Sequence, residues 1–280
     1  MQQPVKTGIF CIIIPVIMKY RLLTILIATG FGSASAYAAP DFWTDDKKFS
    51  LSAGFDYKSG QYDTPNTTEM LAVPATGEYE NGPWTIKVKA PNARVSSPGT
   101  APFGIPHPGT GSFSVGNFTG VDTHSGLDKT VAAATYNLYS GEQSKYGINL
   151  TGKVRLNSPI EGLSTQNEYA AQADAYQSFN RFTALGSLGY RISGRPTGIN
   201  MDKVLYGSFG GSYQLDEALY GGIDLSLSQD SSLAGSGQRE ISAYVSHKFS
   251  KNFKAKGYVL KGFSNSSPDS TLGAKVYYGF

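Results

Sequence analysis

The chain has 280 residues, with 24 Lys and Arg against 21 Asp and Glu, and it contains a single cysteine. The first 38 residues hold three of the basic side chains, Lys6, Lys19 and Arg21, and no acid, so the remaining 242 residues carry 21 charges of each sign. This balance gives no support to a nucleic-acid partner. Removal of Cys11 with the first segment would exclude disulfides and cysteine-based metal sites from the rest.

Residues 1–38 have the pattern of a secretory signal peptide. A short basic segment precedes an apolar run at residues 22–28, and small residues follow, so we expect cleavage after Ala38. Two alternatives remain open, namely cleavage at Ala34-Ser35-Ala36 and translation from Met18 with an upstream extension before it. An uncleaved anchor is the less favoured interpretation, because neither apolar run reaches the roughly 20 residues of a membrane-spanning helix.

Alternating apolar and polar side chains begin at residue 48 and predict strands with two different faces. The first strands span residues 48–58, 69–80 and 84–90, and a tight turn at Asn81-Gly82-Pro83 joins the last two. Pro74 lies inside the second strand. Because proline lacks the amide donor that a strand ladder needs, we expect a bulge or a local break there.

Residues 93–125 form the longest segment without alternation, and we expect them to be a loop. Beyond this segment the alternation resumes and predicts further strands at residues 130–138, 146–156, 168–179, 182–191, 204–215, 218–228, 239–249, 253–261 and 272–280. The sequence thus predicts twelve strands, and the connections between them alternate between long and short.

This alternation of connections favours a membrane barrel. In outer-membrane barrels the extracellular loops are long, the periplasmic turns are short, and an even strand number returns both termini to the periplasm. Strands of roughly 9 to 11 residues match a tilted crossing of the hydrocarbon layer. A soluble β-sandwich gives no reason for the alternation. We therefore predict an all-β fold for residues 39–280, a transmembrane antiparallel up-and-down β-barrel of about 12 strands in the bacterial outer membrane.

Aromatic side chains gather at the strand ends beside the short turns, where they would form a girdle at the membrane interface. These residues are Phe49, Tyr79, Trp84, Phe179, Phe182, Phe249, Phe253 and Phe280. The terminal Phe280 also resembles the assembly signal of outer-membrane barrels, which implies the barrel-assembly machinery as a partner.

The inward face of the predicted strands carries charges of both signs. The candidate lumen-lining residues are Lys87, Lys89, Lys153, Arg155, Arg191, Lys254, Lys256, Lys275, Glu78, Asp174, Asp224 and Glu240. Such a lining is typical of a hydrated lumen, although cross-strand ion pairs that only fill the interior are an alternative. Twelve strands fall between small filled barrels and wide porins, so we expect any pore to be narrow.

The expected loop at residues 93–125 holds more apolar side chains than a water-exposed loop needs. We hypothesise that part of it folds into the barrel mouth as a constriction, with a plain surface loop as the alternative. The constriction candidates are Phe103, Ile105, Phe113 and Phe118.

No catalytic, metal-binding or cofactor-binding residue is predicted. His107 and His124 lie in the expected loop, and His247 lies beside a short turn without a nearby acid to orient it. The sequence contains neither a Gly-rich phosphate loop after a strand nor a cluster of His and carboxylates at metal-ligand spacing.

Several short motifs fall at turns and strand ends. They are Tyr79-Glu80-Asn81-Gly82-Pro83-Trp84, Ala134-Thr135-Tyr136-Asn137-Leu138, Gly152-Lys153-Val154, Gly189-Tyr190-Arg191, and Lys261-Gly262-Phe263-Ser264 followed by Ser267-Pro268-Asp269. With these motifs the chain resembles the bacterial family named for the meta-pathway of phenol degradation, whose members are predicted outer-membrane transporters. The family often has Gly-Leu-Gly-Asp before its fourth strand, whereas this chain has Gly126-Leu127-Asp128-Lys129.

The resemblance implies uptake of aromatic or other small hydrophobic compounds. We therefore predict an outer-membrane channel that passes small solutes passively and needs no cofactor, with membrane lipid and a small-molecule solute as its partners. The alternative is a closed structural or surface-interaction barrel that binds a partner through its extracellular loops. Conductance across a planar bilayer separates the two hypotheses.

Overall fold

The computed structural model describes residues 49–61, 67–97, 101–102, 115–116, 122–127, 130–139, 145–156, 167–193, 202–229 and 237–280. The signal peptide predicted at residues 1–38 and the constriction candidates Phe103, Ile105, Phe113 and Phe118 lie outside these residues. In the part of the chain that the structure describes, no helix is long and apolar enough to cross a membrane.

The alternating sequence forms antiparallel strands throughout the described chain. They are β1 (Phe49–Gly60), β2 (Thr68–Asn81), β3 (Trp84–Ser97), β4 (Ala101–Pro102), β5 (Val115–Gly116), β6 (Asp122–Leu127), β7 (Val131–Tyr139), β8 (Tyr146–Arg155), β9 (Glu168–Phe179), β10 (Phe182–Ser193), β11 (Asp202–Gln214), β12 (Leu219–Ser228), β13 (Arg239–Lys248), β14 (Phe253–Gly262) and β15 (Ser270–Gly279).

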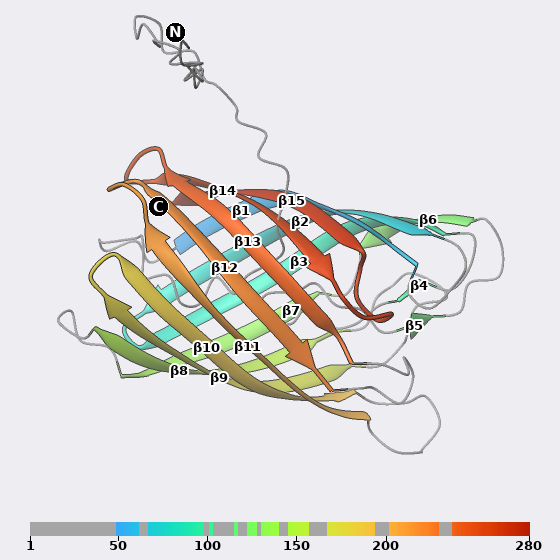
Figure 1. Cartoon of the computed structure of the whole chain (residues 1–280), viewed down its shortest axis with the longest axis horizontal. Helices are drawn as coiled ribbons and strands as arrows, with labels where there is room; N and C mark the ends of the chain where they lie inside the picture. Colours follow the sequence, from blue (N-terminus) through green and yellow to red (C-terminus); the bar gives the residue numbers. More distant parts are fainter. Residues whose placement is uncertain are drawn as a thin grey trace, which may run out of the picture.

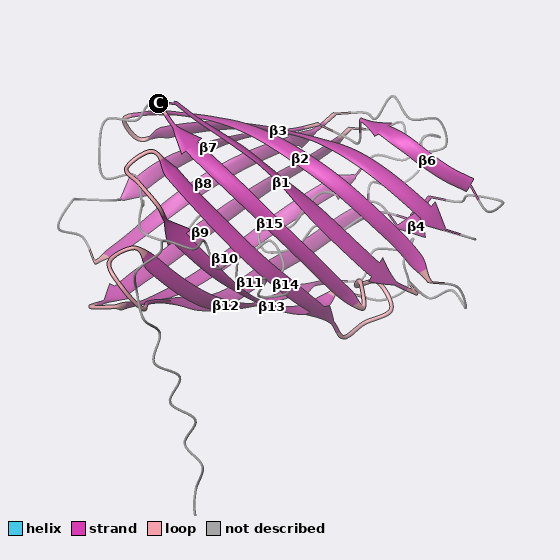
Figure 2. Ribbon diagram, turned by 90° about the horizontal axis from the view of Figure 1, so that it is seen from above, coloured by secondary structure: helices cyan, strands magenta, loops and turns pink. Residues whose placement is uncertain are grey.

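Twelve of these strands close into a barrel (Figures 1 and 2). From β7 to β15 each strand pairs with the next one along the chain, and the ring is completed by β15 with β1, β1 with β2, β2 with β3, and β3 with β7. Closure leaves no free edge in the ring, so the backbone of every barrel strand has a partner on both sides. The predicted fold class and strand number are confirmed.

The short turns gather at one end of the barrel because successive strands run antiparallel. Two of them contain only two residues, since Asn81 pairs with Trp84 across one turn and Phe179 pairs with Phe182 across the other. The first residue of each turn has a left-handed backbone, with φ of 57° at Gly82 and 58° at Asn180. Glycine and asparagine adopt this conformation at the least cost, which explains how the chain reverses so sharply there.

The structure differs from the prediction over residues 93–125, which were expected to form a single loop. β3 continues to Ser97 and pairs there with β6, while β4 and β5 pair with one another. Figure 1 places β4, β5 and β6 at the end of the barrel opposite the C-terminus. Pro91 and Pro98 flank the extension of β3 and interrupt the alternation of its side chains. The sequence therefore did not predict that this extension pairs with β6.

Pro74 causes a local break without a bulge. The β1–β2 register is the same on both sides of it, with Ala53 opposite Ala75 and Asp56 opposite Ala72, while the positions between these pairs are unpaired on that side. On its other side Pro74 lies opposite Pro91 of β3. Two prolines thus share one cross-strand position, and the ladder loses amide donors at a single height.

The two faces of the sheet have inverted polarity compared with a water-soluble protein. In the described strands the outer face exposes large apolar side chains, and the buried side chains are mostly polar or charged. Exposed apolar residues include Leu71, Val73, Ile86, Val88, Ile148, Leu150, Leu188, Leu205, Phe209, Ile223, Leu225, Ile241, Val245 and Val276. Such a continuous apolar surface is stable in lipid, whereas in water it would promote aggregation.

All eight predicted girdle aromatics lie on the outer surface, with exposed fractions between 36% and 56%. Several contact one another around the short-turn end, where the ring centroids of Phe49 and Phe280 are 5.6 Å apart and those of Phe249 and Phe253 are 5.5 Å apart. Amphipathic or aromatic rings at this height fit the boundary between hydrocarbon and headgroups.

On the inner wall, four tyrosines lie directly opposite glycines of the neighbouring strand. The cross-strand pairs are Gly147 with Tyr176, Gly189 with Tyr206, Gly222 with Tyr244, and Gly273 with Tyr258. A Cβ atom added to any of these glycines would lie between 2.3 and 2.7 Å from atoms of the tyrosine ring. The absence of a side chain therefore lets each ring lie against the wall.

This contact predicts that Gly189→Ala destabilises the barrel by about 1–3 kcal/mol, because the methyl group must displace the Tyr206 ring. Urea unfolding of the barrel refolded in lipid vesicles measures the change. Gly152→Ala is the matched control, since nothing lies within 4 Å of its added Cβ atom. Equal unfolding midpoints for the two variants would contradict the steric explanation.

Candidate functional site

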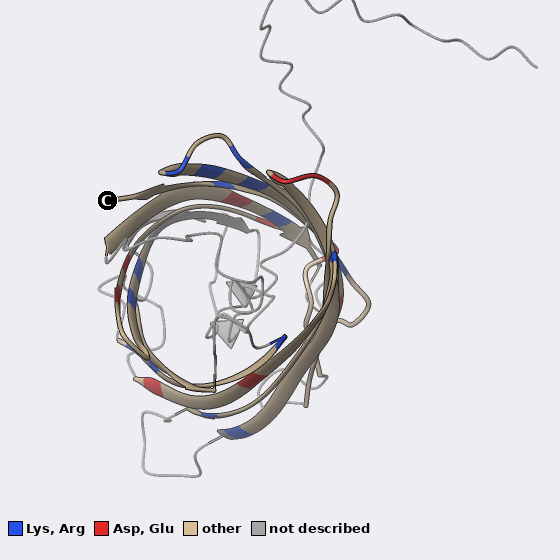
Figure 3. Ribbon diagram, turned by 90° about the vertical axis from the view of Figure 1, so that its left-hand side faces the viewer, with Lys and Arg blue, Asp and Glu red and all other residues tan. Residues whose placement is uncertain are grey.

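The interior of the barrel is the candidate site. The structure places all twelve predicted lumen residues on barrel strands, on the face opposite the exposed apolar side chains. The side chains of Lys153, Arg155, Asp174, Asp224 and Glu240 are buried, and those of Glu78, Lys87, Lys89, Arg191, Lys254, Lys256 and Lys275 are partly exposed. Figure 3, a view along the barrel, shows basic and acidic positions distributed around its wall. Their role in lining a path for solutes stays a prediction.

On the wall formed by β8 and β9, opposite charges lie next to one another. Arg155 and Glu168 form an ion pair with an N–O distance of 3.7 Å. The Nζ atom of Lys153 donates a hydrogen bond of 2.6 Å to Oε1 of Gln172, and the amide of Gln172 donates to Asp174. This wall is balanced in charge and nearly sealed from water, which fits the interpretation that these groups fill the interior.

A second ion pair is more open. The Nζ atom of Lys87 lies 2.6 Å from Oε2 of Glu78 across the β2–β3 ladder, and their side chains are 19% and 25% exposed. Water therefore reaches this part of the wall in the described structure. An ion pair that keeps this much contact with water contributes little to stability.

The wall formed by β13, β14 and β15 has a different composition. Several lysines and tyrosines lie there on the inner face, and we call Tyr244, Lys248, Lys254, Lys256, Tyr258, Lys275 and Tyr277 the lysine–tyrosine wall. The Nζ atoms of three of its lysines lie over aromatic rings: Lys256 is 3.8 Å from the Tyr244 ring centroid, Lys254 is 4.6 Å from that of Tyr277, and Lys275 is 5.2 Å from that of Tyr258. Attraction between a cation and a π face holds these ammonium groups along the wall.

The sequence reasoning missed some interior residues. Lys58 lies one pleat beyond Asp56 and is 5% exposed, and it interacts electrostatically with Lys89 and Glu240 from other strands. Lys58 is the last residue of the strand predicted at residues 48–58, and the alternation that places Asp56 inward places Lys58 inward as well. Tyr206 is also inward, and its hydroxyl donates a hydrogen bond of 3.2 Å to Oε1 of Gln172. Tyrosines are harder to assign from sequence because they suit both faces of a barrel.

His247, which lies beside a short turn, has an aromatic partner. The His247 ring packs edge-on against Phe249 with a centroid distance of 4.5 Å, consistent with a girdle position. In the described part of the chain, no group of three or more His, Cys, Asp and Glu residues could hold a metal ion.

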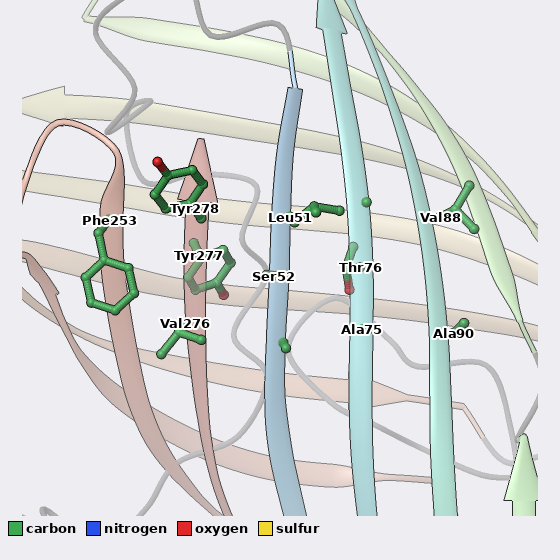
Figure 4. A pocket seen from close by; sticks show the side chains of 12 residues that line it. Leu51, Ser52, Ala75, Thr76, Val88, Ala90, Phe253, Val276, Tyr277 and Tyr278 are labelled. Atoms are coloured by element: carbon green, nitrogen blue, oxygen red, sulfur yellow. The ribbon is translucent and has the colours of Figure 1, made fainter. Parts of the chain in front are cut away.

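A hollow of about 550 Å³ opens on the outer wall over β14, β15 and β1 to β3 (Figure 4). It forms because Ala53, Ala75 and Ala90 occupy one cross-strand row, so small side chains leave a depression between larger ones. Figure 4 shows Leu51 and Tyr278 among the larger side chains around it. The hollow lies on the outer face of the barrel, and its lining is almost entirely apolar.

No family model matches the sequence, and no curated protein matches it either. The fold, in contrast, is similar to solved structures. An outer-membrane channel from Pseudomonas putida F1 superposes with a TM-score of 0.63 at 10% identity, over 86% of this chain and 99% of that one. The NanC porin gives 0.52 at 8% identity, over 82% and 98% of the two chains. The beta domain of the Bordetella autotransporter BrkA gives 0.52 at 12% identity, over 84% and 100%.

At these identities the similarity shows the fold. It agrees with the closed ring, the apolar outer surface and the aromatic girdle, all of which are features of the chain itself. The chain is an outer-membrane β-barrel, and the predicted location in the bacterial outer membrane is confirmed.

The difference in burial between the two ion pairs generates a prediction. Glu168→Ala is expected to destabilise the barrel by about 3–5 kcal/mol, because it leaves the charge of Arg155 in a sealed part of the interior. Glu78→Ala, the matched control, is expected to cost about 0–1 kcal/mol. Urea unfolding in lipid vesicles compares them, and equal losses would show that burial does not distinguish the pairs.

Proposed function

We propose that the protein is a channel for passive movement of small solutes across the outer membrane. The observation that supports this most directly is the combination of a closed ring with interior side chains that water reaches, such as Lys87 and Glu78. A barrel that served only as a membrane anchor would gain nothing from partly hydrated ion pairs in its interior, because such pairs add little stability.

The fold comparison supports a channel without deciding the matter. Two of the similar structures are a channel and a porin, but the third is the beta domain of an autotransporter. The same architecture therefore serves different tasks, and function depends on the interior of each barrel. The competing hypothesis, a closed barrel that binds a partner through its extracellular loops, predicts no conductance.

Aromatic or other small hydrophobic compounds are the solutes that the resemblance to the phenol meta-pathway family suggests. Turn and strand-end motifs carry that resemblance. We keep this solute class as part of the proposal, together with the constriction formed by Phe103, Ile105, Phe113 and Phe118. We also propose that residues 1–38 are removed as a signal peptide and that Phe280 is read by the barrel-assembly machinery.

Planar-bilayer recording tests the channel directly. The full mature chain, refolded in detergent and added to the bilayer, is expected to give discrete current steps in potassium chloride. Folding is checked in detergent gels, where a folded barrel migrates at a different rate before and after heating. The competing hypothesis predicts no current steps from barrels that pass this check. Folded barrels without conductance would overturn the proposal.

Assembly through the terminal aromatic residue predicts that Phe280→Ser lowers the amount of barrel in the outer membrane severalfold. Phe249→Ser is the matched control, because both rings are exposed at the same end of the barrel. Membrane fractionation measures the yield, and refolding in vesicles separates recognition from stability. Equal outer-membrane yields for the two variants would contradict the role of Phe280 as a signal.

A further inference from the structure

The charged side chains on the outer face of the barrel gather at one end. Among the outward side chains that the structure describes on the barrel strands, the charged ones are Glu69, Lys203, Arg239 and Lys261, and all four are exposed. Each lies at the strand end beside a long connection. Long connections face the outside of the cell in barrels of this class. The outer face is therefore apolar over most of its height and mainly basic at its extracellular end.

The other end of the same face has a different composition. Beside the short turns, the outward side chains of the described strands include Phe49, Trp84, His247 and Phe253, without any Lys, Arg, Asp or Glu. Long charged side chains can extend toward water at either membrane boundary, so this property alone does not explain why they occur at one end. The difference fits a membrane whose two leaflets carry different headgroups.

Two of the cations are neighbours on adjacent strands. Arg239 begins β13, and Lys261 is the penultimate residue of β14. Ile241 lies opposite Lys261, and the amide of Phe263 donates a hydrogen bond of 2.8 Å to the carbonyl oxygen of Arg239. Arg239 and Lys261 therefore occupy diagonal positions on one face, which are about 7–8 Å apart in a sheet. Their long side chains can converge on a single anion between them.

The acids near this pair do not balance it. Glu240 follows Arg239 in the chain but faces the interior and is buried. Glu69 lies three strands from Lys261 around the ring, where its carboxylate accepts a hydrogen bond from β1. Asp269, at the start of β15, is exposed and is the one described acid beside the pair. Two cations with one carboxylate leave a net positive charge at the surface.

Apolar side chains continue from the basic positions toward the other end. Leu227 lies opposite Arg239 on β12, and Leu225 lies opposite Ile241. These three apolar side chains are between 38% and 49% exposed on the outer face. On β11, Lys203 adds another exposed cation on the far side of β12. Basic groups above an apolar surface complement an amphipathic molecule with an anionic head and hydrocarbon tails.

From this arrangement we propose that Arg239 and Lys261 bind a phosphate group of the lipid in the outer leaflet of the outer membrane. The acyl chains of that lipid lie on Leu225, Leu227 and Ile241. The planar guanidinium of Arg239 donates two parallel hydrogen bonds to phosphate oxygens, and the ammonium of Lys261 adds a point charge. The inference concerns the outer face and is independent of the proposed channel, which depends on the interior.

Titration with lipid A, the phosphorylated anchor of the outer-leaflet lipid, tests the site. The full mature chain is refolded in detergent, and native mass spectrometry measures the bound lipid. Saturable binding is expected for the wild type. Each basic side chain near an anionic lipid surface contributes about fivefold in affinity, so Arg239→Gln with Lys261→Gln is expected to weaken binding about thirtyfold. Lys251→Gln is the matched control, because Lys251 is exposed in the turn between the same two strands at the other end.

Two further arms identify the chemistry that is recognised. Lipid A from which the phosphates have been removed is expected to bind the wild type as weakly as the phosphorylated lipid binds the double variant. Inorganic phosphate alone is expected to bind far more weakly than the lipid, because it lacks the tails. Arg239→Lys with Lys261→Arg keeps both charges and is expected to retain most of the affinity.

Three outcomes would overturn the proposal. They are equal binding of the two forms of lipid A to the wild type, equal affinity of the double variant and the Lys251→Gln control, and binding of inorganic phosphate as tightly as the lipid. Folding of every sample is checked by gel migration before and after heating. If the double variant does not fold, the single variants Arg239→Gln and Lys261→Gln carry the same test, each with an expected fivefold loss.

Discussion

Backbone pairing in lipid is the constraint on which this structure depends. A peptide group that faces hydrocarbon has no water to bond, so each amide and carbonyl of a membrane-spanning strand needs a partner within the protein. The antiparallel ring of twelve strands meets this demand by joining β15 to β1 and β3 to β7. Between β1 and β2, the pairing is interrupted near Pro74, but the register is the same on both sides of the interruption.

Once the ring is closed, the period of two along each strand separates two environments. Apolar side chains face lipid, and charged ones must find partners or water inside. The barrel uses both solutions. Arg155 and Glu168 are sealed together, while Lys87 and Glu78 remain in contact with water. At four other positions of the inner wall, a glycine opposite a tyrosine lets the large ring lie against the wall.

Much of this arrangement could be predicted from sequence. Strand number, the outward face and the girdle follow from alternation that is local and repeated, as in the final strand from Leu272 to Phe280. The pairing of β3 with β6 could not be predicted, because it joins residues on both sides of a proline-rich segment whose own pattern is irregular. The alternation of the strands correctly placed Lys254, Lys256 and Lys275 on the inner face. The sequence did not predict that these lysines lie opposite other lysines of β13, β14 and β15, because that depends on the register between neighbouring strands.

The order of the ring also bears on how the protein is made. β1 is the first barrel strand to leave the ribosome and β15 is the last, yet they are neighbours. The strand edges of β1 and β14 can therefore be joined only when β15 is present. Loss of β15 would leave β14 and β1 each without a partner on one side, so closure of the ring depends on this last barrel strand.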